Sequence, residues 1–519
     1  MALRVSLMDG GGVVEALSLL RDSMTSVFVV TGPVAGMDGP GLARTTALGV
    51  SPLSGAVAET RAEGPFAAGM RRAGITGVGL HGAAPSPVCV VVTDGVVSVE
   101  PAEDLWGLDT FRAFDRLADR YGADSVTAVI GPAGERGVRY ASVVTCRDHP
   151  LPRLGFGALL GAKHVKAVVC RGSSAPQPAS PASLARIAAW YAAAVPENSL
   201  TRLQHGTPGF AVWSGPPGYA AVANFADTST PSAVDAPVLE RVAACPGCPT
   251  DCMKVYAGTA VHQEALAMLG ANLGVADPFP LHTSCVRLGV DPVSFGGAAA
   301  AAGIAPVDVA AALEGLAADD PYGVGAGAAG PAAMTSKGVE LPPFDPRVQP
   351  NLGLAYAVSP IGPRYDAVEH DLDFDPVAGL PAAFDEVRAL GVPVPRPLGT
   401  LDPAGTAILM RLWSGLDALG VCLYAATPTR PLTLSTVEDL VLAVTGSRPD
   451  VMALGAERFA LQHDINRRLG VGPDRDTLPD RFFTEPVSAG PYRGAVLDRT
   501  AFTDAVVTLR QLLFGGFTP

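Results

Sequence analysis

The most constraining feature of the sequence is a group of three cysteines, Cys245, Cys248 and Cys252, in the segment CPGCPTDC. The spacing C-x2-C-x3-C allows three thiolates to converge on one soft metal centre. The chain has only 8 cysteines in all, so three within one short segment are unlikely to cluster by accident. Two prolines and a glycine between them interrupt regular structure, and the segment is therefore expected to form a tight loop. The backbone N–H groups of such a loop can donate to sulfur and tune the potential of a cluster.

Three kinds of site are compatible with this loop. An iron–sulfur cluster accepts three thiolates that are close in sequence and one that is distant. A structural zinc site needs four nitrogen or sulfur ligands, usually as two paired knuckles, and only one CxxC occurs here. A disulfide loop would need an oxidising compartment, which nothing else in the sequence suggests. The sequence favours an iron–sulfur cluster over zinc, and zinc over unreactive thiols.

Composition limits the function classes. The chain has 519 residues, of which 48% are hydrophobic and 17% charged, so two to four domains with sizeable cores are expected. The net charge of −13 argues against nucleic acid as a partner. No apolar stretch approaches the roughly 18 residues of a membrane span. The first residues lack a basic segment followed by an apolar one, so no signal peptide is expected. These features predict a soluble, cytoplasmic protein.

The pattern of apolar residues changes along the chain. Short β-branched runs between glycine-rich turns predict strands in the first third, at Val27–Val30, Val88–Val92, Val126–Ile130 and Val165–Val169. Later segments have a helical pattern, at Ala182–Ala194, Ala260–Leu273, Gly405–Leu419 and Val451–Arg468. The sequence therefore predicts an α+β fold with a β-rich N-terminal domain over residues 1–180. Two mostly helical domains follow, one over 181–340 that carries the cysteine loop and one over 341–519.

Several motifs occur in a characteristic order across nearly the whole chain. They are TGPVAGMDGPGLARTTALGVSPLSG (Thr31–Gly55), IGPAGERGVRYASV (Ile130–Val143), RLGFGALLGAKHVKAV (Arg153–Val168), QHGTPG (Gln204–Gly209), the cysteine loop, EALAMLGANLGV (Glu264–Val275), LGVDPVSFG (Leu288–Gly296), FDPR (Phe344–Arg347), GLAYAVSP (Gly353–Pro360), DALGVC (Asp417–Cys422) and DTLPDRF (Asp476–Phe482). This order resembles the aldehyde ferredoxin oxidoreductase family, whose members carry a tungsten or molybdenum bis-pterin centre and an iron–sulfur cluster.

The resemblance implies a fourth ligand for a [4Fe-4S] cluster. The family has it in a D-x-x-G-L-C motif, which matches Asp417, Gly420, Val421 and Cys422, with valine in place of leucine. Spacing alone could not identify Cys422, because an isolated cysteine is more often an ordinary buried residue. The remaining cysteines have no such support and are expected to be small core residues: Cys89, Cys146, Cys170 and Cys285.

The resemblance also implies a set of pterin contacts. The residues expected to contact the cofactor are Arg44, Arg61, Arg153, Gly155, Gly157, Asp291, Asp417, Gly420 and Val421. Closely spaced glycines let backbone amides approach a ligand, and arginine offers a planar charged donor. A carboxylate such as Asp417 can accept N–H bonds from a pterin ring. Without the resemblance, glycine-rich loops are more often turns and surface arginines are usually solvated.

Several departures from the family pattern concern the pterin. Arg61 and Glu63 replace a neutral amide and a glycine of the family motif S-N-x-G-G, and Val286 replaces an aspartate that should hold one pterin. A family histidine falls near Tyr365, and the C-terminal lysine of the pterin site has no secure match. Glu63 would repel a pterin diphosphate unless Arg61 neutralises it. Three explanations stay open: altered pterin contacts, one cofactor in a different form, or a paralogue that keeps only the cluster for electron transfer or structure.

The resemblance further implies the chemistry and the partners. Family members oxidise an aldehyde, and a related carbonyl is an alternative substrate here. Glu264 is the candidate acid/base because the corresponding family helix begins with glutamates; it could instead be a solvated first-turn carboxylate. His262 is a second candidate, and His205 could contact substrate or be structural. The expected partners are ferredoxin or a small iron–sulfur subunit, and a homodimer is an alternative assembly.

Overall fold

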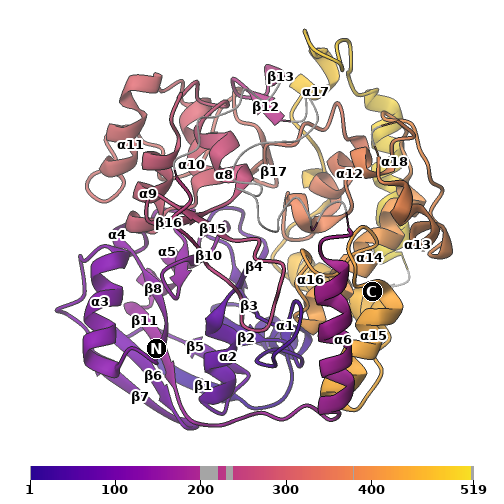
Figure 1. The fold of residues 1–519 in the computed structure, drawn as a ribbon. Helices are drawn as coiled ribbons and strands as arrows, with labels where there is room; N and C mark the ends of the chain where they lie inside the picture. Colours follow the sequence, from indigo (N-terminus) through magenta and orange to yellow (C-terminus); the bar gives the residue numbers. More distant parts are fainter. Residues whose placement is uncertain (1, 199–200, 202–219, 230–237, 378, 516–519) are drawn as a thin grey trace.

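The computed structural model describes residues 2–198, 201, 220–229, 238–377 and 379–515. His205 and the rest of the QHGTPG stretch lie outside these residues. The first third of the chain contains two sheets, and the remainder is mostly helical (Figure 1). The predicted α+β order, with a β-rich region first, is confirmed. None of the described helices is both long and apolar enough to cross a bilayer.

The first sheet has five antiparallel strands in the order β1-β5-β2-β3-β4. Their bounds are Arg4–Met8 (β1), Gly77–His81 (β5), Val27–Thr31 (β2), Arg44–Val50 (β3) and Val57–Glu63 (β4). The central strands are almost continuously buried because helices contact them. These helices are α1 (Val13–Asp22), α2 (Pro65–Arg72) and α16 (Val451–Arg468). The sheet thereby presents the ends of β3 and β4, with Arg44 and Glu63, to the interior.

The second sheet has six strands in the order β10-β9-β8-β11-β6-β7. Only β11 and β6 are parallel. The strands are His149–Leu151 (β10), Val143–Thr145 (β9), Val126–Ile130 (β8), Val165–Arg171 (β11), Val88–Thr93 (β6) and Val96–Pro101 (β7). Helices α3 (Thr110–Tyr121), α4 (Pro132–Glu135) and α5 (Phe156–Ala162) pack on it. All four strands expected from the β-branched runs form, starting at the predicted residues.

Helices α14 (Pro403–Leu419) and α16 form the closest helix pair of the C-terminal part. A Cβ atom on Gly415 would lie 2.0 Å from Val451 O, and one on Gly455 would lie 1.9 Å from Arg411 O. The two glycines therefore allow the helix backbones to approach each other. Asp402 and Asp450 cap the N-termini of α14 and α16 by accepting backbone N–H bonds.

The other helices of the chain connect and cover these elements. They are α6 (Pro181–Ala194), α8 (Gln263–Leu269), α9 (Phe279–Leu288), α10 (Pro292–Ala301), α11 (Val309–Gly315), α12 (Pro350–Val358), α13 (Phe384–Ala389), α15 (Leu434–Thr445), α17 (Arg481–Thr484) and α18 (Arg499–Phe514), with the short 3-10 helices η2 (Pro306–Asp308), η3 (Tyr365–Ala367), η4 (Asp371–Phe374), η5 (Pro381–Ala383) and η6 (Pro473–Arg475). Small sheets are formed by β12 (Ala220–Val222) with β13 (Asp227–Ser229), β14 (Arg241–Val242) with β15 (Lys254–Tyr256) and β16 (Thr259–Val261), and β17 (Thr335–Ser336) with β18 (Val339–Glu340).

Two features of the helical part differ from what the sequence alone suggests. The helix expected at Ala260–Leu273 is shorter, because Thr259–Val261 pairs with β15 as a strand and Gly270 ends the helix. Helix α6, which the sequence assigns to the middle domain, packs on α15 of the C-terminal part (Figure 1). The domain boundaries at residues 180 and 340 stay a prediction.

Candidate functional site

The four cysteines expected to hold a cluster line one small cavity. Cys245, Cys248 and Cys252 lie on the loop between β14 and β15, and Cys422 follows the C-terminus of α14. Burial is the main cause that raises the pKa of the Cys422 thiol, and the nearby Glu63 carboxylate and the Cys245 and Cys252 thiols raise it further. A metal that binds here must therefore displace protons from the thiols.

Glycines bring the two cysteine-bearing segments together. Cys422 donates its backbone N–H to Gly41 O at 2.9 Å, and a Cβ on Gly41 would lie 3.4 Å from Cys422 N. Gly247 has a φ of +69°, and a Cβ there would lie 2.4 Å from Gly39 N. The Gly39-Pro40-Gly41 turn thus contacts both the cysteine loop and the Cys422 segment. A hydrogen bond of 2.9 Å between Tyr191 and Thr250 ties the loop to α6.

The set of thiols fits a [4Fe-4S] cluster. Cys245, Cys248 and Cys252 from one loop and Cys422 from a distant segment line one cavity. Such a cluster is held by cysteine thiolates, and three ligands that are close in sequence with one that is distant fit this pattern.

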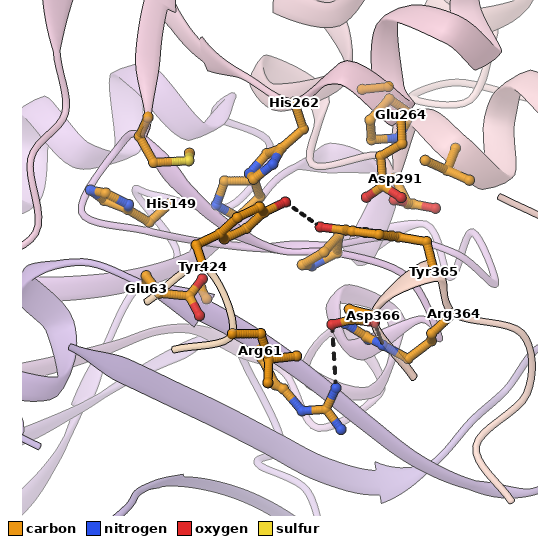
Figure 2. A pocket seen from close by; sticks show the side chains of 18 of the residues that line it. Arg61, Glu63, His149, His262, Glu264, Asp291, Arg364, Tyr365, Asp366 and Tyr424 are labelled. Carbon is orange, nitrogen blue, oxygen red and sulfur yellow. Dashed lines mark hydrogen bonds and ion pairs between the residues drawn. The ribbon is translucent and has the colours of Figure 1, made fainter. Parts of the chain in front are cut away.

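A second, larger cavity adjoins the thiols. It has a volume of about 160 Å³, against about 20 Å³ for the cavity between the thiols. Glu63, Met253 and Tyr424 line both cavities, so the two cavities are contiguous. Figure 2 shows 18 of the side chains that line it. The lining residues come from β3, β4, β9, β10, α8, α9, α10, η3, η4, α14 and the loops next to these elements.

Charged residues on one side of the larger cavity belong to a set of paired charges centred on Asp417, which is not itself among the lining residues. Its Oδ1 accepts from Arg44 Nη1 at 2.6 Å, and its Oδ2 lies 2.6 Å from Arg61 Nη2 and 3.3 Å from Arg458 Nη2. Arg44 also pairs with Glu63 at 2.6 Å. Both oxygens of the Asp417 carboxylate are thus engaged by guanidinium groups of the same chain.

The pairing extends beyond Asp417. Arg61 lies 3.5 Å from Asp366 and 3.7 Å from Glu59. Each of these carboxylates has a second arginine: Arg364 lies 2.7 Å from Asp366, and Arg458 lies 2.6 Å from Glu59. Burial, followed by the charges of Arg364 and Arg458, lowers the pKa of Arg61 to about 10, so it stays cationic at neutral pH. We call this eight-residue group the arginine–carboxylate network. Its members are Arg44, Arg61, Arg364, Arg458, Glu59, Glu63, Asp366 and Asp417, and their formal charges cancel.

The opposite side of the cavity carries the candidate acid/base residues. Glu264 lies in the first turn of α8 and is 7% exposed, and burial raises its pKa to about 8. Its Oε2 has no hydrogen-bond partner among the described residues. Burial also lowers the pKa of the nearby His262. Asp291 caps α10 by accepting the Ser294 N–H at 2.8 Å, and burial raises its pKa.

Two tyrosines connect across the cavity. Tyr365 and Tyr424 share a hydrogen bond of 2.5 Å between their hydroxyls. In Figure 2 this pair lies between two groups of labelled side chains, namely His262, Glu264 and Asp291 on one side and Arg61, Arg364 and Asp366 on the other. The phenol pair therefore separates the acid/base side of the cavity from the arginine–carboxylate network.

Arg153 and the glycines that follow it lie beside the cavity rather than on its surface. Arg153, Leu154 and Gly155 have φ values of +66°, +61° and +81°, a strained run for two non-glycine residues. Arg153 is buried and donates from Nη2 to Glu340 O, while its Nε and Nη1 lack partners within the described chain. Arg153 is a positive neighbour of Glu264 and Asp291, which do line the cavity.

Because Gly155 and Gly157 have no side chain, other parts of the protein can pack closely against them. A Cβ on Gly155 would lie 2.1 Å from Arg139 O, and one on Gly157 would lie 2.6 Å from Ser142 O. The Gly157 N–H donates to Ala141 O at 2.8 Å. Neither glycine is among the residues that line the cavity. Both glycines allow close packing around α5, and the expectation that they contact a cofactor stays a prediction.

Gly420 and Val421 likewise support the thiol site through packing. Gly420 has a φ of +75°, and a Cβ there would lie 2.8 Å from Gly32 Cα. Val421 is fully buried. Val286, in place of the family aspartate, lines the larger cavity. Of the cysteines expected in the core, three are buried and Cys146 is partly buried.

Sequence reasoning missed four members of the network, Glu59, Arg364, Asp366 and Arg458, and also Tyr424. Arg364 and Asp366 flank Tyr365 in the segment IGPRYD, where the family histidine falls, and that was the only available signal. Glu59 and Arg458 pair across 399 positions, which no local pattern indicates. Buried charges of this kind become visible only when the sheet and α16 are packed together.

Comparison with known proteins accounts for almost the whole chain. The model of the aldehyde ferredoxin oxidoreductase N-terminal domain matches residues 18–172, and that of domains 2 and 3 of the same family matches residues 186–305 and 321–509. The chain belongs to the aldehyde ferredoxin oxidoreductase family. The resemblance seen in the ordered motifs is thereby confirmed.

Individual relatives are distant. The tungsten-containing aldehyde ferredoxin oxidoreductase of Pyrococcus furiosus is 26% identical, over 90% of this chain and 84% of its own length. The WOR-like subunit of an aliphatic sulfonate oxidoreductase from the same organism is 28% identical over 28% of this chain and 25% of its own length. Among solved structures, the active site complex BamBC of benzoyl coenzyme A reductase, in complex with 1,5-dienoyl-CoA, is similar with a TM-score of 0.78. That likeness covers 97% of this chain and 90% of the other at 18% identity, and it concerns the fold alone.

Proposed function

We propose that this protein is an oxidoreductase that oxidises an aldehyde or a related carbonyl compound to a carboxylate. In this proposal a tungstopterin or molybdopterin occupies the larger cavity, and a [4Fe-4S] cluster is held by the cysteine loop and Cys422. Ferredoxin or a small iron–sulfur subunit receives the electrons, in the cytoplasm. The observation that carries the proposal is the contiguity of the two cavities, which share Glu63, Met253 and Tyr424.

The lining of the larger cavity supports a polar heterocyclic ligand. Six of its buried polar atoms have no hydrogen-bond partner in the part of the chain that the structure describes: Arg61 Nε, Ser142 Oγ, Glu264 Oε2, Asp291 Oδ1, Trp413 Nε1 and Arg430 Nε. Buried polar groups in native proteins are normally satisfied, so these atoms indicate a ligand with both donors and acceptors. The polar groups of these residues are therefore of the kinds that a pterin can hydrogen-bond. When bound, the metal pterin would supply a centre that takes two electrons from the substrate and passes them on one at a time.

The chain's own residues supply proton handling and orientation. Glu264 is protonated at neutral pH because its pKa is about 8, so it can donate a proton near the substrate and recover it afterwards. The hydroxyls of Tyr365 and Tyr424 can orient a carbonyl oxygen by donating to it. Both tyrosines line the cavity, whose burial limits the access of water.

A second function is favoured by one observation. Asp417 is fully engaged by Arg44 and Arg61, and Val286 offers no carboxylate at the other family position. A paralogue without the pterin metal would use the cluster for electron transfer, or as a structural or partner-binding subunit. It would contain iron and sulfide but neither tungsten nor molybdenum.

Metal analysis of anaerobically purified protein separates the two functions. The oxidoreductase should contain tungsten or molybdenum with about four irons per chain, and should reduce a viologen dye with a set of short aldehydes. Iron without heavy metal or pterin, and without dye reduction, would reject the oxidoreductase and support the paralogue.

A further inference from the structure

We propose that the Arg61 guanidinium takes the place of one pterin, so that this chain seats a single pterin dithiolene on the Glu264–Asp291 side of the cavity. This inference rests on the proposed function and specifies how its cofactor is held. It follows from an asymmetry between the two sides of the cavity. One side is closed by the arginine–carboxylate network, where both oxygens of Asp417 are engaged, and the other carries carboxylate and hydroxyl oxygens without partners.

The chemistry of the Asp417 pair explains why a guanidinium can replace a pterin. The aminopyrimidinone edge of a pterin presents two adjacent N–H donors to a carboxylate. A guanidinium presents the same pair of donors in one plane. In this chain the two donors come from two guanidinium groups: Arg61 Nη2 lies 2.6 Å from Asp417 Oδ2, and Arg44 Nη1 lies 2.6 Å from Oδ1. Both oxygens of the carboxylate that a pterin ring would need are therefore already paired.

The surroundings of Arg61 hold it in that position. Asp366 lies 3.5 Å away and Glu59 3.7 Å away, and both are buried. Because the arginine–carboxylate network is electrically balanced, displacing Arg61 would leave several buried carboxylates without their counter-charge. Leaving a buried charge unpaired is strongly unfavourable. A ring that entered here would therefore have to break more interactions than it could replace.

The opposite side of the cavity carries oxygen atoms without partners instead of a closed set of ion pairs. Arg153 has three carboxylates, Glu264, Asp291 and Glu340, as electrostatic neighbours, and its Nε and Nη1 have no partner among residues that the structure places. Ser142 Oγ and Glu264 Oε2 are also unsatisfied and line the cavity. Together with Asp291 Oδ1, these unpartnered oxygens are groups that one seated heterocycle would satisfy.

The test is the ratio of pterin to iron in the full chain, produced anaerobically in a host that makes the metal pterin. Pterin is released by acid oxidation and quantified by fluorescence, and iron is measured in the same sample. We expect about one pterin per four irons. Two pterins per cluster would overturn this inference and leave the proposed oxidoreductase intact. Iron without any pterin would overturn both.

Two matched substitutions give opposite expectations. Arg61→Asn, combined with Glu63→Gly, should raise the ratio from about one towards two, because it frees Asp417. Arg153→Asn should lower the ratio below one, because it removes the positive neighbour of Glu264 and Asp291 on the side that seats the ligand. Unchanged iron content shows that each variant has folded. If Arg153→Asn fails that control, Glu264→Gln takes its place. A fall in pterin with Arg61→Asn/Glu63→Gly, at full iron content, would refute the assignment of Arg61 as an occupant.

Discussion

Arg44 and Asp417 lie 373 positions apart in the sequence, and Arg44 Nη1 is 2.6 Å from Asp417 Oδ1. Arg44 is the first residue of β3, and Asp417 lies in the last turn of α14, shortly before Cys422. Both side chains are buried. The pair therefore ties the first sheet to the helix that positions the fourth thiol, and Arg44 also lines the larger cavity.

Removing Cys422 should abolish the cluster. Cys422→Ala takes away the one thiol that does not come from the loop, and Cys248→Ala takes away one that does, so both should lose most of the iron and the visible cluster absorption. Cys89→Ala is the matched control, because Cys89 is buried in β6 away from the four thiols. Full iron content in Cys422→Ala would show that this thiol is not a ligand.

The cysteine loop should depend on Gly247. Gly247→Ala places a Cβ 2.4 Å from Gly39 N at a φ of +69°, and should displace the loop and lower iron content. Gly258→Ala is the control: its φ is +80°, but nothing lies within 4 Å of the new Cβ. The backbone cost of about 1–2 kcal/mol is common to both. Equal iron content in the two variants would contradict the role of the close Gly39–Gly247 contact.

Breaking a buried ion pair of the network should destabilise the fold. Arg458→Met leaves Glu59 without the partner 2.6 Å away that links β4 to α16. Removal of one partner of a buried pair costs about 3–5 kcal/mol, and the thermal unfolding midpoint should fall by several degrees. Arg388→Met, in the exposed pair with Asp385, should leave the midpoint almost unchanged. Similar midpoints for both variants would show that the buried pair is not stabilising.

Glu264 should make stability depend on pH. Its pKa is raised from 4.5 to about 8 in the folded protein, so the folded chain keeps a proton that the unfolded chain releases. The stability tied to this proton is present below pH 4.5 and declines as the pH rises to about 8. Glu264→Gln removes this decline, and should raise the thermal midpoint relative to wild type at about pH 8.5 but hardly at about pH 5. The exposed Glu103→Gln variant is the control. A difference that is the same at both pH values would reject the assignment.

Much of the fold could be predicted because its signals are local. The runs that begin at Val27, Val88, Val126 and Val165 became buried strands, since β-branched residues between turns favour that state. The exception at Thr259–Val261 arose because pairing with β15 overrode a helical pattern. The domain limits and the individual ligand roles stay predictions.

The sequence by itself determined the order of strands and helices, the family, and the spacing of three thiols, because each depends on neighbours along the chain or on ordered motifs. Only the tertiary structure decided that Cys422 meets the loop, that Gly157 packs against protein, and that Arg61 pairs with Asp417. Those contacts join segments hundreds of residues apart, and they depend on how closely glycine-bearing backbones approach and on which buried charges find a partner. No local pattern of residue types carries that information.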